Sequence, residues 1–282
     1  MHRMFGILAL AMAAWSAHAA TAIDLSQAVI QPAPDVPEQV LKFFLKELDE
    51  HAPGHHTAVA AAEAKAPGPV ISLSIAPEGL QPEGYSIAVV REGGASTVQV
   101  RGADARGLLF GVGRLIRVLK LAPDSISVED DVAITSSPRY RIRGHQLGYR
   151  PTANTYDAWD LDTFDRYIRE LILFGTNSIE LIPALGERGE KTAHMPVPPR
   201  KMNAMLSELI HAYGLDVWLW APVGEDLAQA GAAEEALERR REFYAEMKNI
   251  DAVFIPGGDG GNNPIRLLMP FLEQLAPVLH AA

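Results

Sequence analysis

The chain has 282 residues, of which 48% are hydrophobic and 21% are charged, a composition typical of a globular protein and not of a disordered chain or a fibrous rod. Its formal net charge of -10 argues against a surface that binds nucleic acid. It contains no cysteine, which excludes disulfides, thiol catalysis and cysteine-ligated metal centres.

The first residues are typical of a secretory signal peptide. Arg3 supplies a positive charge, the apolar run 5–14 is too short to cross a bilayer, and Ala17-His18-Ala19 has the pattern of a cleavage site. We therefore predict a signal peptide over residues 1–19, with cleavage near Ala19 and with Ala22 as an alternative. The mature protein is expected in the periplasm or outside the cell, with no membrane partner.

Residues 20–137 are predicted to form a small α+β domain. Helices are expected over 37–51 and 104–120, and strands over 70–75, 84–91 and 96–101. Residues 20–35 are expected to be an extended lead-in, and residues 123–138 a connection of strand and turn. Gly107, Gly111 and Gly113 lower helix propensity in the second helix, which predicts close packing of that helix on a sheet. The expected architecture is a sheet with helices on one face.

Residues 138–282 show a different pattern, in which short apolar strands alternate with amphipathic helices. Strands are expected over 140–147, 177–183, 216–221 and 252–256, and helices over 161–174, 199–213, 232–248 and 264–280. Gly175 and Gly214 follow two of the helices, as glycine commonly does at helix ends. This alternation predicts a parallel sheet covered by helices.

Four such units are half of the eight in a TIM barrel, and spacing alone leaves open whether they form part of a barrel or an open, doubly wound sheet. No strand is followed by a Gly-x-Gly-x-x-Gly turn, so no dinucleotide site is predicted, and no cofactor is expected. The free edges of a half barrel predict self-association.

Polar and aromatic residues follow the predicted strands at their carboxyl ends, where ligands bind in parallel α/β folds. Aromatic rings can stack on a sugar, and carboxylates can bind its hydroxyls or act in glycoside hydrolysis. This combination predicts a carbohydrate ligand. The residues are His145, Tyr149, Glu180, Trp218, Trp220 and Glu225.

A glycine-rich loop over 256–264 is the most specific motif. Four glycines flank Asp259, which lets the backbone approach a ligand closely, and Asn262 follows. An adjacent carboxylate disfavours phosphate. Calcium remains an alternative for this loop, although the spacing differs from that of known calcium loops. His51, His55 and His56 are expected to be solvated, with transition-metal binding as an alternative, and the absence of a His-Glu-x-x-His motif argues against a metalloprotease.

Two segments resemble carbohydrate-active enzymes. The sequence V-R-G-A-D-A-R-G-L-L-F-G at 100–111, followed by P-R-Y-R-I-R-G at 138–144, resembles the N-terminal domain and barrel entry of glycoside hydrolase family 20 β-N-acetylhexosaminidases and family 67 α-glucuronidases. The resemblance implies that a TIM barrel follows and that Arg143 binds sugar hydroxyls. Asn177 falls where family 20 has an asparagine. Gly257-Gly258-Asp259 resembles the family's Gly-Gly-Asp-Glu signature, in which Asp orients the substrate and Glu is the general acid.

The sequence also departs from the family 20 pattern. Gly260 stands where the acid should be, Gly148 replaces the aspartate of the first strand, and Ile179-Glu180-Leu181-Ile182 replaces a histidine-rich strand end. Cleavage of N-acetylhexosamines by the substrate-assisted route is therefore not expected. The resemblance implies a relative within the broader group of families 20 and 67.

Together these patterns predict an α/β protein: an α+β N-terminal domain (20–137) followed by a partial TIM barrel of about four βα units (138–282). We predict an exported, truncated glycoside hydrolase-like protein of carbohydrate metabolism. The alternatives are a carbohydrate-binding module, a pseudoenzyme or an inactive fragment. The predicted catalytic residues are Asp259, Glu180 and Glu225, and the predicted substrate-binding residues are Arg143, His145, Tyr149, Trp218, Trp220 and Asn262.

Overall fold

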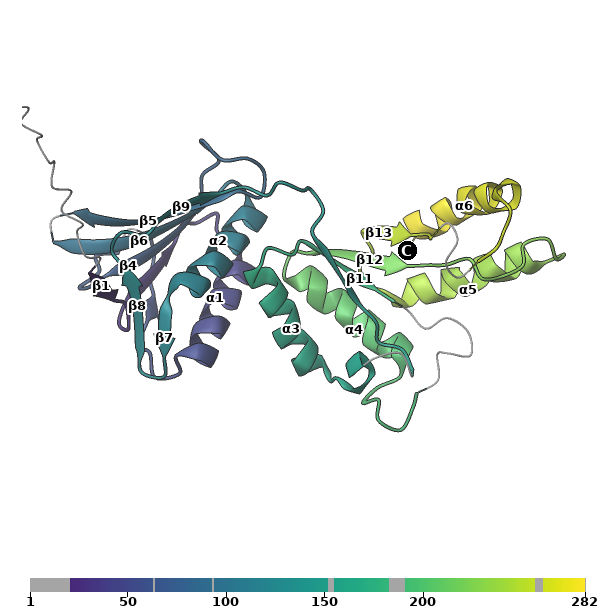
Figure 1. Cartoon of the computed structure of the whole chain (residues 1–282), viewed down its shortest axis with the longest axis horizontal. Coiled ribbons are helices and arrows are strands. Elements are labelled where there is room, and N and C mark those ends of the chain that lie inside the picture. Colours follow the sequence, from purple (N-terminus) through teal and green to yellow (C-terminus); the bar gives the residue numbers. More distant parts are fainter. Residues whose placement is uncertain are drawn as a thin grey trace, which may run out of the picture.

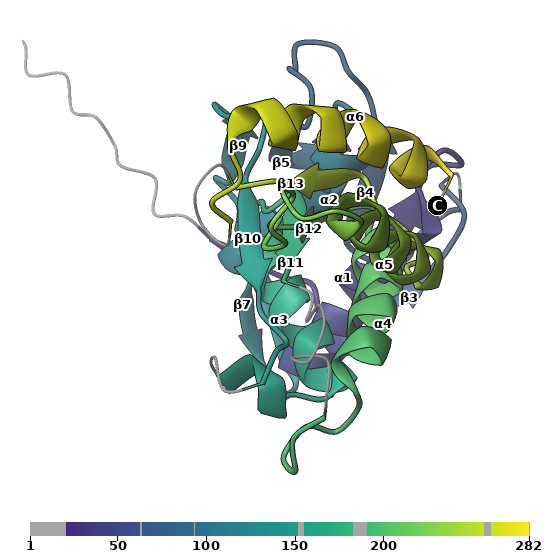
Figure 2. The ribbon, with the colours of Figure 1, turned by 90° about the vertical axis from the view of Figure 1, so that its right-hand side faces the viewer.

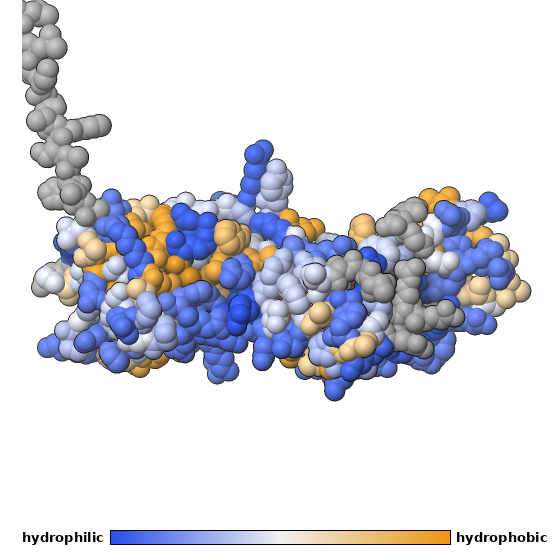
Figure 3. All heavy atoms as spheres, turned by 60° about the horizontal axis from the view of Figure 1, so that its bottom comes forward, coloured by the Kyte–Doolittle hydropathy of each residue, from blue (hydrophilic) through white to orange (hydrophobic). Residues whose placement is uncertain are grey.

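The computed structural model describes residues 21–62, 64–92, 94–151, 155–182, 191–256 and 261–281. It consists of an α+β part, here called the N-terminal part, followed by a part in which strands and helices alternate (Figure 1). Figure 3 shows hydrophobic residues gathered over one side of the N-terminal part, whereas the same side of the other part is mostly hydrophilic. None of the described helices combines the length and the apolar character needed to cross a bilayer.

The N-terminal part contains a six-stranded mixed sheet with the order β3-β2-β4-β6-β5-β9 and a three-stranded antiparallel sheet with the order β1-β8-β7. Helices α1 (Glu38–His51) and α2 (Ala105–Val118) pack against each other, and α2 packs on the larger sheet. The strands are β1 (Ala22–Asp24), β2 (Val29–Pro32), β3 (Ala58–Val59), β4 (Val70–Ile75), β5 (Tyr85–Glu92), β6 (Ala95–Gly102), β7 (Lys120–Ala122), β8 (Ser125–Glu129) and β9 (Ala133–Ser136).

The close approach of α2 to the sheet depends on glycines at the contact. A side chain at Gly107 would place its Cβ 2.3 Å from the carbonyl oxygen of Gly84, and one at Gly111 would meet Tyr85 and Val100 at 3.0 Å. Both glycines therefore serve the helix-on-sheet packing that the sequence predicted. Gly113 differs, because its neighbours belong to the following helix α3 (Leu161–Leu173).

The remaining part contains four parallel strands in the order β10-β11-β12-β13. They are β10 (Gly144–Leu147), β11 (Ser178–Leu181), β12 (Asp216–Trp220) and β13 (Ala252–Phe254). The helices α3, α4 (Pro199–Ala212), α5 (Ala232–Glu246) and α6 (Ile265–His280) lie around one side of the strands, and a 3₁₀ turn, η1 (Thr155–Ala158), precedes α3 (Figure 2). This is the arrangement of a partial TIM barrel, and it is called the half barrel below.

Helix ends in the half barrel follow the sequence signals. Gly175 and Gly214 have φ values of +87° and +76°, the left-handed conformation that ends a helix at least cost in glycine. Asp160 caps α3 by accepting the backbone N–H of Thr163 at 2.9 Å. Helix boundaries therefore agree with the expected ranges to within a few residues.

A buried ionic network joins the N-terminal part to the half barrel. Arg169 on α3 is 2% exposed and pairs with Glu47 and Glu50 on α1, and with Asp165 on its own helix. Burial raises the pKa of Glu47, although the neighbouring guanidinium opposes that shift. Lys46 on α1 adds a contact of 2.7 Å to Asp165. These contacts connect α1 to α3 through charges that are largely removed from water.

Candidate functional site

The strands of the half barrel present alternating residues to two different environments. On the face toward the helices, Leu147, Leu181 and Leu219 lie side by side in register and are fully buried. On the opposite, concave face, Gln146 pairs in register with Glu180, and Glu180 with Trp218. Because side chains alternate along a strand, the apolar set forms the core and the polar and aromatic set remains open to a ligand.

The concave face contains a cavity of about 300 Å³. Gln146 donates a hydrogen bond through Nε2 to the carboxylate of Glu180. Within the part of the chain that the structure describes, no cation pairs with Glu180. Its carboxylate therefore keeps acceptor capacity for a ligand. The cavity is lined by Ile142, Gly144, His145, Gln146, Ser178, Glu180, Trp218 and Phe254.

His145 belongs to the strand segment that lines this cavity, but its ring lies on the other face of the sheet, against Tyr167 of α3. The Tyr167 hydroxyl lies 3.0 Å from Nε2 of His145, and the two rings meet edge to face. Burial lowers the pKa of His145 below its ordinary 6.5, so the ring is neutral at neutral pH. Burial and Tyr156 raise the pKa of Tyr167 to about 12, so its hydroxyl keeps its proton. Because His145 alternates with Gln146 along β10, its ring lies on the face toward the helices, where it packs with Tyr167 and supports the strand.

Aromatic side chains extend the concave face beyond Glu180. Trp218 and Trp220 are both half-buried and stand two residues apart on β12, hence on the same face. Phe254 lies beside Trp220 in register and is 47% exposed. The candidate residues chosen from the sequence did not include Phe254. The signal that could have identified Phe254 is strand alternation, because residues two apart on a strand, such as Ala252 and Phe254, lie on the same face.

Two predicted ligand-binding residues have other roles in the structure. The side chain of Tyr149 is fully buried, packs against Phe164 and donates its hydroxyl to the carbonyl of Val197 at 2.8 Å, so it cannot serve as a sugar platform. Arg143 precedes β10 at the amino end of the strand, and its guanidinium binds Glu83 at 2.6 Å and the carbonyl of Gly175 at 2.7 Å. Its donors therefore face the N-terminal part and not the carboxyl ends of the strands.

Glu225 also differs from its predicted catalytic role. Its carboxylate pairs with Arg240 at 2.9 Å and with Arg239 at 3.1 Å, and Arg240 is 2% exposed. Burial alone would raise the pKa of Glu225, but the hydrogen bonds and charge of Arg240 outweigh it and lower that pKa. A carboxylate held by two arginines is suited to fixing the loop that follows β12 and is poorly suited to proton transfer.

The glycine-rich loop lies partly outside the described residues, and Asp259 is among the residues that are not described. Asn262, at the end of the loop, is exposed. The neighbouring Asn263 donates to the carbonyls of Val223 and Glu225 at 3.0 and 2.7 Å, which ties the loop to the segment that follows β12. A Cβ on Gly261 would lie 2.0 Å from the carbonyl oxygen of Val223, so this approach requires glycine.

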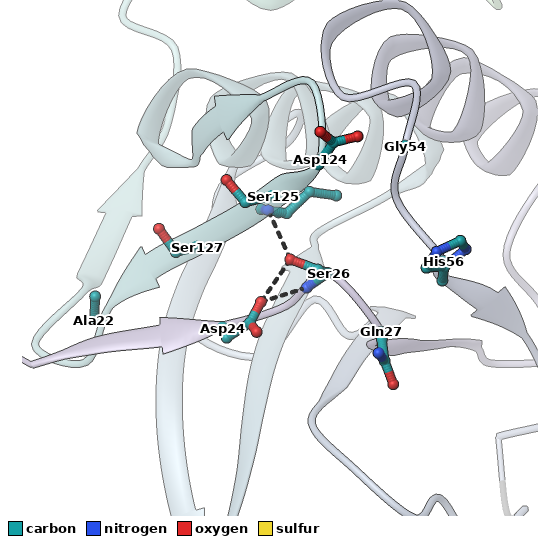
Figure 4. Close-up of a pocket in the computed structure, with 10 residues that line it drawn as sticks. Ala22, Asp24, Ser26, Gln27, Gly54, His56, Asp124, Ser125 and Ser127 are labelled. Carbon is teal, nitrogen blue, oxygen red and sulfur yellow. Dashed lines mark hydrogen bonds between the residues drawn. The ribbon is translucent and has the colours of Figure 1, made fainter.

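A second cavity, of about 630 Å³, lies in the N-terminal part between β1, β8 and the segment after α1 (Figure 4). Asp24 accepts hydrogen bonds from the backbone and hydroxyl of Ser26, which in turn accepts the N–H of Ile126 at 3.0 Å. The polar groups of Asp24 and Ser26 thus hold the turn together. Among the described residues that line this cavity there is no phenylalanine, tyrosine or tryptophan, so it lacks the indole surface of the concave face. Among the described residues, no cluster of three or more histidine, aspartate or glutamate side chains is arranged to hold a metal ion.

The fold is similar to the folds of several solved glycoside hydrolases. The chain is similar to the family 20 β-N-acetylhexosaminidase from Streptomyces coelicolor A3(2), with a TM-score of 0.69 and 14% identity over 93% of this chain and 62% of that one. It is also similar to a Streptomyces plicatus β-hexosaminidase variant in complex with GlcNAc, with a TM-score of 0.67, 15% identity, and coverage of 93% and 61%. For the family 20 exo-β-N-acetylglucosaminidase from Vibrio harveyi, the TM-score is 0.65, with 14% identity and coverage of 92% and 48%.

These similarities establish the fold, a small α+β part followed by a partial TIM barrel, as the sequence resemblance to family 20 predicted. The chain spans less than two thirds of the length of the three enzymes. No protein-family model and no curated protein sequence matches it.

Proposed function

We propose that this chain is an exported, glycosidase-like protein whose concave half-barrel face binds a saccharide and hydrolyses an O-glycosyl bond. One observation carries the proposal: among the described residues no cation pairs with the carboxylate of Glu180, which lies in one cavity with Gln146 and Trp218. An indole face can stack on a sugar ring, while the carboxylate and amide bind hydroxyls. The similar fold supports the same substrate class, because two of the similar structures are named hexosaminidases and a third is named an exo-β-N-acetylglucosaminidase.

In this proposal the two carboxylates of hydrolysis are Glu180 and Asp259. Glu180 lies midway along β11, and Asp259 belongs to the glycine-rich loop after β13, the strand at the far end of the sheet from β10. Glycine occupies position 260, where family 20 has its general acid. The proposal therefore does not include the family's substrate-assisted route.

The test is turnover and binding across a panel of glycosides. We expect Glu180→Gln and Asp259→Ala each to lower hydrolysis by at least about a hundredfold, the size of effect that removal of a general acid or base has. Trp218→Ala should weaken binding. The matched control is Glu234→Gln, at an exposed glutamate on α5. This substitution should leave both hydrolysis and saccharide binding unchanged. Wild-type rates in both carboxylate variants would reject the assignment.

A second candidate function is saccharide binding without hydrolysis. Two observations favour it: glycine replaces the family acid at position 260, and Glu225 is bound to two arginines. Calorimetry with the same panel separates the two functions, because heat of binding without release of reducing ends indicates a binding protein. Release of reducing ends indicates an enzyme.

Export is part of the proposal. The charged, apolar and small-residue segments of positions 1–19 have the order of a signal peptide. Expression of the complete chain in a bacterium with two membranes should place the product in the periplasm, with an N-terminus at Ala20. Intact-mass analysis of the cell fractions checks both points, and an uncleaved product in the cytoplasm would contradict them.

A further inference from the structure

Glu83 lies at the junction between the N-terminal part and the half barrel. It precedes β5 and has a φ of +57°, in the left-handed region that residues other than glycine rarely adopt. Its backbone N–H donates to Asp104 at 2.8 Å, the residue that also caps α2 through the N–H of Gly107. The surrounding contacts thus hold Glu83 in a costly conformation, and they aim its carboxylate at the half barrel.

The carboxylate of Glu83 reaches the starts of two neighbouring strands. One oxygen pairs with Arg143, which precedes β10, at 2.6 Å. Asn177, which precedes β11, donates its amide to both oxygens at 3.2 Å. Asn177 also accepts the backbone N–H of Arg143 at 2.9 Å, so the two strand starts are locked to each other as well as to Glu83.

Arg106 of α2 extends the same contacts to the third strand. Its guanidinium lies 3.5 Å from Glu83 and pairs with Asp216, the first residue of β12, while its Nε donates to the carbonyl of Gly214 at 2.7 Å. The group formed by Glu83, Arg106, Arg143, Asn177 and Asp216 is called the junction cluster below. It fixes β10, β11 and β12 at their amino ends.

The junction cluster lies close to the saccharide cavity along each of these strands. Gly144, Ser178 and Asp216 are aligned in register, and two residues further on are Gln146, Glu180 and Trp218. Arg143 and Asn177 stand three residues before Gln146 and Glu180, and Asp216 stands two before Trp218. A strand rises about 3.3 Å per residue, so these positions are about 7–10 Å apart along the strands. Movement of one strand start would therefore shift one cavity side chain relative to the other two.

We propose that Glu83 is a positioning residue for the saccharide cavity: from the N-terminal part it sets the relative heights of β10, β11 and β12, and thereby the alignment of Gln146, Glu180 and Trp218. This inference rests on the proposed function for its ligand. The contacts of Glu83 exist without a ligand, so its effect on the strands can be measured independently of saccharide binding.

The experiment compares Glu83→Gln with wild type in the complete chain. Loss of charge-assisted hydrogen bonds should speed amide hydrogen exchange in β10, β11 and β12 by about tenfold and weaken saccharide binding by about the same factor. The ¹⁹F resonance of Trp218 in protein labelled with 5-fluorotryptophan, assigned with Trp218→Phe, should shift or broaden. Glu78→Gln is the control, because Glu78 is an exposed glutamate with a long 3.8 Å contact to Arg101.

Glu83→Gly separates the side chain from the backbone, since glycine adopts a φ of +57° without strain. It should reproduce the exchange and ¹⁹F changes of Glu83→Gln. The proposal is overturned if either variant matches wild type in β10–β12, or if exchange rises equally in β4–β6, which would indicate general destabilisation. Failure of wild type to bind any saccharide, with the ¹⁹F and exchange changes present, would reject the proposed function and leave the positioning role standing.

Discussion

Among single residues, His145 is the one whose burial gives the clearest pH dependence. Its folded pKa lies below 6.5, the ordinary value that it regains in the unfolded chain. Between these two values the unfolded chain binds a proton that the folded protein does not. The free energy of unfolding should therefore be insensitive to His145 above about pH 6.5 and should fall as the pH decreases below it.

Urea denaturation at a series of pH values measures this effect. We expect His145→Gln to show a shallower loss of stability below pH 6.5 than wild type, whereas replacement of the exposed His280 by Gln should leave the slope unchanged. Equal slopes for wild type and His145→Gln would show that the imidazole is as free to take up a proton in the folded protein as in the unfolded chain.

Glu225 provides a test of a structural against a catalytic role. Glu225→Gln leaves the guanidinium of Arg240, which is 2% exposed, without its neutralising partner. We expect a loss of about 3 kcal/mol in the free energy of unfolding and unchanged saccharide turnover under conditions where the variant is folded. Glu235→Gln removes an exposed pair to Arg239 and should cost less than about 0.5 kcal/mol.

If Glu225→Gln abolished turnover while thermal denaturation remained that of wild type, the carboxylate would be catalytic after all. The ion pairs with Arg239 and Arg240 would then have to open during the reaction.

At the level of elements, the pairing of α1 with α3 depends on charges that are largely buried. Arg169→Met removes the cation from Glu47, which is 2% exposed, and should lower the free energy of unfolding by about 3–5 kcal/mol. The double variant Glu47→Leu with Arg169→Met should recover much of that loss, because two apolar side chains replace two buried charges. Chemical denaturation of the two variants checks both expectations.

Lys42→Ala is the control for this element pair. Lys42 and Glu38 form an exposed pair on α1, with 71% and 78% of their side chains accessible, so its removal should change stability by less than about 0.5 kcal/mol. A single variant Arg169→Met as stable as Lys42→Ala would show that Glu47 is neutralised in some other way, as by taking up a proton.

The sequence patterns identified the long elements and missed the short ones. Helical periodicity and the glycines at 175 and 214 predicted the bounds of α3 and α4 to within a residue or two, because both signals are local. Strands β1 and β8 were not recognised as a pair, since each is short and Ala22 finds its partner at Glu129. The first barrel strand was expected from residue 140, but β10 begins at Gly144; Arg143, directly before it, binds Glu83 of the N-terminal part.

The candidate site was predictable only in part for a related reason. Alternation along the strands correctly brings Glu180 and Trp218 to one face, because the period of a strand is fixed. Tyr149 was misassigned because it follows β10, where the chain has left the regular strand and turns its ring into the core. The partners of Arg143 and Glu225 come from other elements, and no local pattern reveals them.

At the scale of the whole molecule, the half barrel leaves two strand edges open. In the described part of the chain, β10 and β13 each pair on one side only. Phe254 of β13 is 47% exposed, and Ile265 and Met269 of the following helix α6 are 74% and 50% exposed. Free edges next to apolar residues favour association. We expect light scattering to show a mass that rises with protein concentration above that of a monomer, and Phe254→Lys to reduce this rise.

The control for association is Val59→Lys, which changes an exposed apolar residue on β3 in the N-terminal part, 47% exposed and remote in sequence from the half barrel. This substitution should leave the rise of the measured mass with protein concentration unchanged. A constant monomer mass for the wild type at every concentration would contradict self-association through the β13 edge.

The uncovered indoles of β12 also give the protein a built-in optical reporter. Trp218 and Trp220 are half-buried on a face that no described strand covers, whereas Trp159 packs edge to face against Tyr156. Whatever occupies that face, a sugar or a second polypeptide, removes water from the two rings. The tryptophan emission should then move to shorter wavelength and resist quenching by acrylamide, so occupancy can be followed without any label.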